Sequence, residues 1–493
     1  MNYLIGIDIG TSGTRSVLFD TQGNVVAAAT AEYPLYQPQN GWAEQTPEDW
    51  WQAVCTTLRE ISAKADGPVA GIGLSGQMHS MVLLDREDRV IRPAILWCDQ
   101  RTGEQCRKIE HLIGRERLVS ITGNPALPGF TASKLVWVQD NEPDNYARCA
   151  HILLAKDYIR FKLTGQYATE VSDASGMQLL DVPGRCWSEE VCRALNVTPD
   201  QLPKVYESTE ITGYVTPEAA EQTGLAAGVP VAGGGGDNAA AAIGMGVYAP
   251  GRAFTTIGTS GVVFTPTERP VVDPEGRIHT FCAAAPGTWH VMGVTQAAGL
   301  SLNWFRRTLA PDLSYAQIDV GCRDIPKGSD RLIYLPYLMG ERTPILDSDA
   351  RGVFFGLSAI HTRLHMARAV IEGVSCSLYS CLDVIRQVGI EVCDMALCGG
   401  GGKSAFWRQL LCDMYGMAIG TVASEEGAAL GAAILGGCAA GVFANVEEGC
   451  SRMVRLGDQV QPDRENHEIY MQLYQRYCAL YPALKECFRG LAE

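Results

Sequence analysis

The chain has 493 residues, a formal net charge of −15, and 46% hydrophobic against 19% charged residues. This length exceeds what one hydrophobic core ordinarily supports, so it predicts two domains. The negative charge argues against nucleic acid or an anionic membrane surface as a partner. An anionic ligand would therefore be held by oriented backbone dipoles and a cation such as Mg²⁺ rather than by a basic surface.

The chain start and the cysteines favour a protein of the reducing cytoplasm. Residues 1–6 have neither the basic segment nor the long apolar segment of a secretion signal. One long uncharged segment, residues 427–445, is rich in Ala and Gly and is interrupted by Gly436 and Gly437, which favours a buried helix and its end over a membrane span. The 17 cysteines include no C-x-x-C pair and indicate free thiols, while a redox role for one of them stays open.

A five-residue phrase near the start returns near mid-chain. Residues 9–13 and residues 257–261 both read Ile-Gly-Thr-Ser-Gly, and apolar, β-rich runs flank each copy, which predicts two tight hairpin turns. Glycine permits positive φ and close approach of an anion, while Thr, Ser and the amides donate hydrogen bonds. One copy alone is typical of any hairpin, but two copies in the same context favour two duplicated phosphate-binding domains.

Strands and helices alternate along the first half, which predicts an α/β fold. A helix is expected to begin at Pro47, after the N-cap residue Thr46. Two strands, 69–74 and 94–97, each lead into a loop where polar groups at the strand end are placed to meet a ligand. The residues at these two strand ends are Gln77, Met78, His79 and Asp99.

In the second half, four glycines at 233–236 precede Asp237, Asn238 and a helix-forming run, and Pro250 marks the expected crossover between domains. A strand at 395–397 then leads into a glycine-rich loop and a helix. The chain ends in an amphipathic helix that has one apolar face, formed by Ile469, Leu473, Tyr477, Leu480 and Leu484.

Two aspartates are the main candidates for chemistry. Asp8 ends the first strand beside the first glycine turn, where a carboxylate either holds Mg²⁺, directly or through water, or stabilises the turn. Asp237 either caps a helix or acts as general base toward a substrate hydroxyl. His79 either donates to a sugar hydroxyl or simply ends its strand, and Arg15 either reaches a γ-phosphate or lies in solvent.

The glycine-rich loop 399–404 resembles a P-loop only superficially. Leu397 stands where that motif needs a glycine, so the P-loop interpretation fails. A glycine turn at the start of a helix is nevertheless suited to the adenosine or α-phosphate part of a nucleotide.

Two long, spaced segments carry a family resemblance. Residues 129–137 (GFTASKLVW), and the pattern that runs from Gly352 through His365 to Glu372, resemble the signatures of the FGGY family of carbohydrate kinases. Segments 76–79, 235–238 and 335–344 are similar to those of the branch that phosphorylates xylulose. Cys98 departs from the Asn or Asp that relatives carry there, which leaves the finer sugar preference open.

The resemblance covers essentially the whole chain and implies an architecture. It implies an α/β fold in which two actin-like, ribonuclease-H-like ATPase domains flank a deep catalytic cleft. Residues 1–248 would bind the sugar and carry the catalytic base, and residues 249–493 would bind ATP. We expect the terminal helix, 466–488, to pack back on the first of these domains.

The resemblance, with the duplicated turns, also assigns the site. Asp237 would be the catalytic base, and Asp8 would act in catalysis as the residue nearest Mg²⁺. The sugar would contact Gln77, Met78, His79, Asp99, Asp237 and Asn238. ATP, the co-substrate, would lie along Thr11, Ser12, Gly13, Arg15, Gly258, Thr259, Ser260, Gly400, Gly401 and Ser404.

The expected substrate is a neutral 2-ketopentose, D-xylulose, phosphorylated at O5. The cluster around Met78 and His79 offers one apolar wall and one polar donor, whereas a sugar acid would call for more fixed cations. Ribulose, glycerol, gluconate or a pentitol is the alternative. An actin-like or Hsp70-like ATPase would not need the sugar cluster, and a non-catalytic sugar sensor would not need both aspartates. A homodimer without nucleic-acid or membrane partners is expected.

Overall fold

The computed structural model describes residues 2–492, and it confirms an α/β fold built twice. Within these residues each half contains a seven-stranded sheet. The first has the order β13-β14-β5-β1-β2-β3, with β15 beside β5, and the second has the order β18-β19-β17-β16-β22-β23-β24. In each, an antiparallel meander is joined to a parallel strand, since β1 pairs with β5 as β16 pairs with β22. The duplication inferred from the repeated phrase is therefore a duplication of sheet topology.

The strands of the first sheet are β1 (Tyr3–Ile9), β2 (Gly13–Asp20), β3 (Val25–Glu32), β5 (Val69–Gly76), β13 (Ile211–Tyr214), β14 (Pro230–Ala232) and β15 (Gly235–Gly236). Those of the second are β16 (Gly251–Ile257), β17 (Gly261–Thr267), β18 (His279–Cys282), β19 (Trp289–Thr295), β22 (Val392–Cys398), β23 (Ile419–Val422) and β24 (Leu456–Val460). The smaller strands are β4 (Glu44–Gln45), β6 (Met81–Leu84), β7 (Ala94–Ile95), β8 (His151–Leu154), β9 (Ala168–Glu170), β10 (Leu180–Asp181), β11 (Cys186–Trp187), β12 (Lys204–Tyr206), β20 (Ile333–Leu335) and β21 (Val353–Phe355).

The helices of the first half are α1 (Pro47–Ser62), α2 (Gly103–Ile113), α3 (Arg115–Thr122), α4 (Thr131–Asn141), α5 (Pro143–Arg148), α6 (Ala155–Thr164), α7 (Val171–Ser175), α8 (Glu189–Ala194), α9 (Pro217–Thr223) and α10 (Asp237–Gly244). Those of the second are α11 (Gly299–Leu309), α12 (Tyr315–Arg323), α13 (Arg363–Gln387), α14 (Ala405–Tyr415), α15 (Gly427–Ala439), α16 (Val446–Met453) and α17 (Arg464–Ala492). Short 3₁₀ turns are η1 (Pro199–Gln201), η2 (Ser329–Arg331) and η3 (Gly400–Lys403).

Helix α1 shows how the local sequence dictates the elements. It begins at Pro47, whose fixed φ suits the first helical position, and two carboxylates in its first turn complement the helix dipole. Trp50, Trp51 and Val54 face inward and are at most 1% exposed. The sequence prediction for this helix is confirmed.

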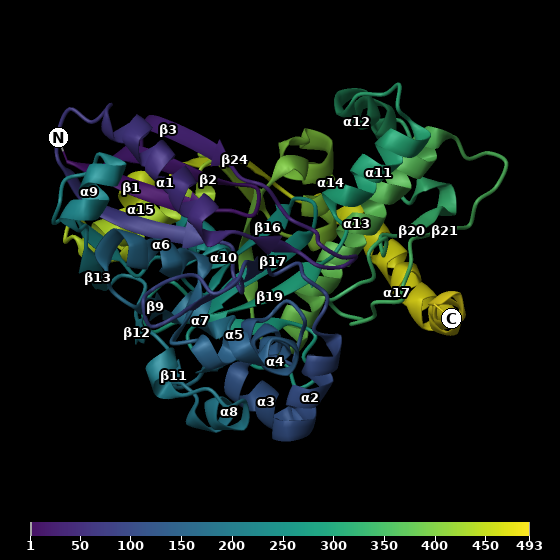
Figure 1. Ribbon diagram of the computed structural model, residues 1–493. Helices are drawn as coiled ribbons and strands as arrows, with labels where there is room; N and C mark the ends of the chain where they lie inside the picture. Colours follow the sequence, from purple (N-terminus) through teal and green to yellow (C-terminus); the bar gives the residue numbers. More distant parts are fainter. Residues whose placement is uncertain (1, 493) are drawn as a thin grey trace.

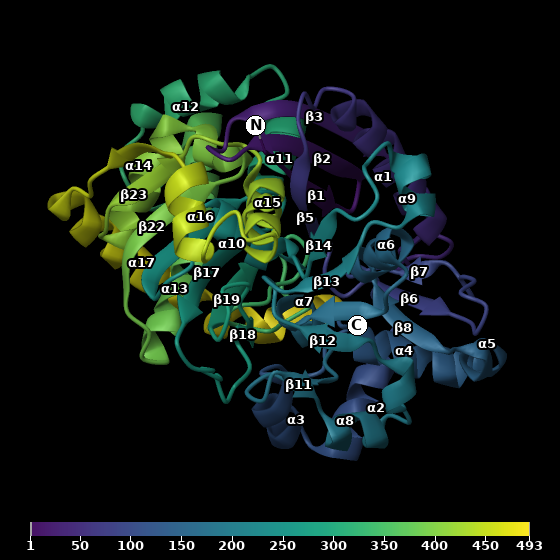
Figure 2. The ribbon, with the colours of Figure 1, turned by 90° about the vertical axis from the view of Figure 1, so that its left-hand side faces the viewer.

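Helices α10 and α15 lie side by side between the two sheets (Figure 2). Although α15 comes late in the chain, it packs on β1 and β5 of the first sheet. Its backbone comes so close that a Cβ at Gly431 would lie 1.8 Å from the Ala240 carbonyl oxygen, and a Cβ at Gly73 would lie 1.7 Å from that of Ala432. The Ala- and Gly-rich composition of the uncharged segment 427–445 is therefore a requirement of close packing, and the helix continues through Gly436 and Gly437.

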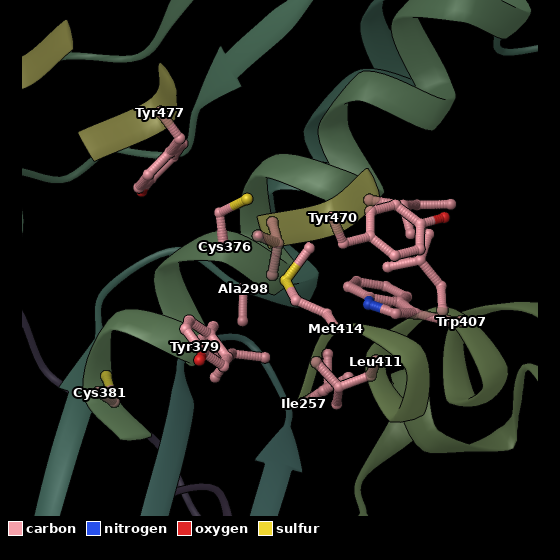
Figure 3. Packing of buried hydrophobic residues seen from close by; sticks show 14 of the residues in the cluster. Ile257, Ala298, Cys376, Tyr379, Cys381, Trp407, Leu411, Met414, Tyr470 and Tyr477 are labelled. Carbon is pink, nitrogen blue, oxygen red and sulfur yellow. The ribbon is translucent and has the colours of Figure 1, made fainter. Parts of the chain in front are cut away.

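The terminal helix α17 does not pack back on the first half, so that expectation is wrong. It contacts α13, α14 and β20 of the second half. Tyr470 and Tyr477 lie in the same buried cluster as Trp407 and Cys376 (Figure 3). In Figure 1, α17 lies on the side of the molecule opposite the N-terminus. The apolar face predicted from the sequence is correct, but amphipathicity does not say which surface it covers.

The helices and the cysteines bear on the environment of the protein. No helix within residues 2–492 is long and apolar enough to cross a membrane. All 17 cysteines lie within the described residues and are free thiols.

Candidate active site

Asp8 and Asp237 lie at the ends of two strands that flank β5 in the first sheet. Asp8 lies near the end of β1, and Asp237 is the first residue of α10, directly after β15. The pairing of β1 and β15 with the two edges of β5 brings both strand ends to the same edge of the sheet. Gly236 occupies the N-cap position, so Asp237 is not the helix cap that an isolated aspartate would suggest.

Both carboxylates are partly buried and hold protons unusually tightly. Burial raises the pKa of Asp237 to about 7, and the negative charge of Asp8 adds to the rise. The backbone amide and the side chain of Asn238 donate hydrogen bonds to Asp237 Oδ1 at 2.6 and 2.9 Å, and these bonds oppose the rise in pKa. Burial also raises the pKa of Asp8, although the Ser75 hydroxyl donates to it at 3.0 Å. Two carboxylates at one sheet edge form a site that favours a general base or a hard metal ion.

His79 is held beside this pair as a neutral ring. It has a left-handed φ of 67°, and its Nδ1–H donates to the Gly176 carbonyl at 2.8 Å. Burial, together with the nearby Lys134 ammonium, holds the pKa of His79 well below 6.5, which leaves Nε2 as an acceptor. Lys134 also donates to the His79 carbonyl at 2.8 Å and to the Gly129 carbonyl at 2.6 Å, which fixes the loop.

Met78 fills the space beside Gly236, the residue before Asp237. Its side chain is 4% exposed, and a Cβ at Gly236 would lie 2.9 Å from Met78 Cγ. Gln77 is also buried, but its amide donates to Gln45 Oε1 at 3.0 Å and its oxygen accepts from Ser80. Gln77 therefore braces the loop. Its contact with a sugar stays a prediction.

Asp99 is not free to bind a sugar, contrary to expectation. It is fully buried, the Ala43 amide donates to its Oδ2 at 2.6 Å, and Arg101 forms an ion pair with it at 2.6 Å. Its position at a strand end suggested a ligand contact, but a carboxylate in that position can equally anchor the loop. The sequence alone does not distinguish these two uses.

The first glycine turn, residues 9–13, is held by hydrogen bonds within the turn and from a neighbouring loop. The Gly10 amide donates to the Gly13 carbonyl at 3.0 Å, leaving Thr11 and Ser12 at the tip. Trp97 Nε1 donates to the Thr11 hydroxyl at 2.9 Å. None of the glycines in this turn has a positive φ, so glycine is present here for space rather than for dihedral freedom.

The second turn has the same sequence but a different register. Ile257 pairs with Gly261, whereas Ile9 pairs with Thr14, so the second loop is one residue shorter. Its carbonyls accept hydrogen bonds from the start of α11, including one of 2.7 Å from the Gly299 amide to Gly258. Neighbouring elements, rather than the turn sequence, set this register.

A cavity of about 580 Å³ opens between the second turn, α11, α12 and the start of α14. Five residues predicted to contact ATP line this single cavity: Gly258, Thr259, Gly400, Gly401 and Ser404. The Ser404 hydroxyl also caps α14 by accepting from the Trp407 amide at 3.0 Å. The structure thus brings together, from two distant segments, the residues assigned to the nucleotide.

Sequence reasoning missed a third wall of this cavity. Gly299, Asn303, Tyr315 and Asp319, on α11 and α12, line it as well. A glycine that opens a helix four residues after the end of a strand was a usable signal for Gly299. The other three stand in no recognisable motif.

Arg15 joins the two halves. Its Nε donates to Glu426 Oε2 at 2.5 Å, a second guanidinium nitrogen contacts Glu426 Oε1, and Nη1 donates to Thr30 at 2.8 Å. Arg15 can therefore meet a γ-phosphate only after exchanging this partner. That role stays a prediction, as do those of Thr11, Ser12, Gly13 and Ser260.

Comparison with known proteins places the chain in a family. The FGGY family of carbohydrate kinases matches with its N-terminal domain over residues 3–244 and its C-terminal domain over residues 253–440. A xylulose kinase of Bacillus subtilis is 39% identical over 489 residues, covering 99% of this chain and 98% of that protein. A gluconokinase of the same organism is 33% identical over 448 residues, covering 88% of this chain and 87% of its own length.

The solved structure of ligand-bound xylulose kinase from Lactobacillus acidophilus superposes with a TM-score of 0.96 at 29% identity, covering all of both chains. The fold therefore agrees over its full length, and the resemblance first seen in the sequence is confirmed. A carbohydrate kinase is favoured over the actin-like ATPase and the sugar sensor. The chain belongs to the FGGY family of carbohydrate kinases and phosphorylates a sugar, with ATP as co-substrate.

Proposed function

We propose that this protein transfers the γ-phosphoryl group of ATP to the terminal hydroxyl of D-xylulose, giving D-xylulose 5-phosphate. The choice of sugar is supported by the full-length similarity to xylulose kinases, which exceeds that to gluconokinase. The observation that carries the chemistry is the pair of carboxylates, Asp8 and Asp237, at one sheet edge.

Asp237 is proposed as the general base. Its pKa of about 7 is matched to proton uptake near neutral pH. The sugar oxygen attacks the γ-phosphorus as its proton passes to Asp237, and ADP leaves with the bridging oxygen. Met78, neutral His79 and Asn238 would align the sugar chain. Because phosphoryl transfer has a loose transition state, alignment and charge neutralisation supply most of the catalysis.

Asp8 is proposed as the protein ligand of Mg²⁺. Within residues 2–492 no cluster of three or more metal-binding side chains exists, and Mg²⁺ commonly takes one or two carboxylates and completes its shell with phosphate and water. The half-buried Asp8 carboxylate, with one hydrogen bond and no ion pair in the described chain, fits this use. When bound, the ion would neutralise charge on the phosphates.

We further propose that residues 1–248 and 249–493 are the two domains and that they close around the substrates. The ion pair between Arg15 and Glu426 bridges them, and α15 of the second range packs on β1 and β5 of the first, so closure would have to move around this packed interface. A homodimer and a cytoplasmic location stay predictions. The free cysteines support a reducing compartment.

A coupled assay of ADP formation tests the proposed sugar. D-xylulose should give the highest kcat/KM among D-xylulose, D-ribulose, L-ribulose, glycerol, D-gluconate and pentitols. A clear preference for any other compound would overturn the assignment to D-xylulose while leaving the kinase family intact.

A further inference from the structure

Arg342 is a cation that the protein itself leaves unpaired. It lies in the loop between β20 and β21 and is half-buried. Within residues 2–492 its guanidinium forms no hydrogen bond or ion pair, and only its backbone amide is engaged, donating to Glu341 Oε1 at 2.8 Å. Burial lowers the pKa of Arg342, the direction expected for a charge that has lost water without gaining a full partner.

The loop that carries Arg342 is held rigidly. Glu341 accepts hydrogen bonds from the Thr295 hydroxyl at 2.6 Å, the Gln296 amide at 2.8 Å and the Ser377 hydroxyl at 3.1 Å. The Thr343 amide donates to the Val294 carbonyl at 3.0 Å. A buried network of this kind positions the intervening residue, so Arg342 is presented in a defined place.

The guanidinium of Arg342 reaches from the second half to the loop before α4 in the first half, which contains Gly129. A Cβ at Gly129 would lie 3.8 Å from Arg342 Nη2. Phe130, which follows Gly129, packs its ring against those of His79 and His279, with ring centroids 4.8 and 5.8 Å apart. The positive charge of Arg342 lowers the pKa of both histidines. Both rings are neutral and cannot compensate it. Gly236, the residue before Asp237, lies against Met78, whereas Gly129 lies against Arg342, which places Arg342 toward the end of the sugar that is far from the base.

We propose that Arg342 determines sugar specificity by binding the oxygen substituents at C1 and C2, opposite the hydroxyl that faces Asp237. This inference rests on the proposed function, since it assumes that an open-chain sugar lies between Asp237 and His79. A guanidinium offers several donors in a planar fork, which suits a hydroxymethyl ketone and suits a carboxylate better. An unpaired buried donor also penalises a substrate that lacks the matching oxygen.

The charge of Arg342 makes binding of a sugar acid more favourable than the sequence alone suggested. Met78 and His79 offer no fixed cation, but Arg342 supplies one from a segment more than two hundred residues away. An aldonate, which carries a carboxylate at C1, should therefore compete with the sugar. The 33% identity to a gluconokinase agrees with a site that is close to accepting such a compound.

The test compares the wild type with Arg342→Met, Arg342→Lys and the control Arg351→Met. Arg351 lies in the same loop but is exposed and donates to the Ser348 and Ala350 carbonyls at 2.8 Å. Steady-state kinetics are measured with D-xylulose and with 1-deoxy-D-xylulose, which lacks the C1 hydroxyl. D-gluconate is tested as a competitive inhibitor against D-xylulose.

We expect Arg342→Met to raise KM for D-xylulose tenfold or more, with KM for ATP within twofold of wild type. The loss should be several-fold smaller for 1-deoxy-D-xylulose, inhibition by gluconate should weaken, and Arg351→Met should be silent. Equal losses with both sugars, or a parallel rise in KM for ATP, would overturn the assignment. If Arg342→Met unfolds, Arg342→Lys carries the same comparison. A wild type inactive on D-xylulose would instead contradict the proposed function.

Discussion

Asp237→Asn is expected to abolish most turnover while leaving the fold intact. Asparagine keeps the size of the side chain and its place at the start of α10, but it cannot accept the hydroxyl proton. Loss of a general base typically lowers kcat by about a hundredfold to ten-thousandfold. Because the pKa of Asp237 is about 7, kcat/KM of the wild type for the sugar should rise with pH up to about pH 7 and then level off. The variant should lack this rise.

The same substitution should stabilise the protein at high pH. Asp237 has a folded pKa of about 7 against an ordinary value of 3.8, so the folded state binds the extra proton between these values. Stability contributed by this group therefore falls as pH rises through that window. About three pKa units correspond to an upper limit of about 4 kcal/mol. Asparagine never ionises, so the variant should exceed the wild type in Tm at pH 8 and match it near pH 4.

Asp85→Asn is the matched control. The pKa of Asp85 is lowered, chiefly because the Arg89 amide donates a hydrogen bond to it. Replacing the Asp85 carboxylate should therefore lower Tm at neutral pH, opposite to the effect of Asp237→Asn, and leave kcat unchanged. The assay couples ADP formation to NADH oxidation, with Tm measured by calorimetry from pH 4 to 8. Near-normal turnover of Asp237→Asn, or a Tm below wild type at pH 8, would refute the reasoning.

Three further changes probe the phosphate side of the site. Asp8→Asn should weaken the dependence of turnover on Mg²⁺, seen as a shifted Mg²⁺ titration; an unchanged titration would remove Asp8 from the metal. Gly258→Val should raise KM for ATP tenfold or more with little change in Tm, because a Cβ at this position meets only the Ser260 carbonyl oxygen, at 3.6 Å. A lower Tm with an unchanged KM for ATP would contradict a role of Gly258 in binding the nucleotide. Tyr315→Ala should raise KM for ATP but not for the sugar, and equal rises would exclude it from the nucleotide cavity.

The local elements were predictable because each is encoded by nearby residues. Pro47 marks the start of α1, alternating strands and helices predict the α/β class, and the repeated phrase predicts the duplication. Contacts between distant segments were not predictable from the same signals. The terminal helix has an apolar stripe whichever surface it covers, and α15 crosses to the first sheet although it belongs to the second half of the chain.

The candidate site shows the same division. Residues in motifs, such as Asp237 and the Gly400 loop, could be proposed as site residues because a short segment carries the pattern that points to their chemistry. Asp99 was misassigned because a strand-end carboxylate serves equally as a ligand and as the partner of a buried arginine. Arg342 was missed because its significance lies in having no partner, which only the folded arrangement reveals.

The most direct test of the account is to identify the product formed from D-xylulose and ATP. After complete conversion, ³¹P–¹H correlated NMR locates the phosphate on the sugar. The account predicts one sugar phosphate per ADP, with phosphorus coupled to the two C5 protons, and no such product from Asp237→Asn on the same timescale. ADP release without a sugar phosphate, or phosphate at C1, would contradict a base that addresses the terminal hydroxyl.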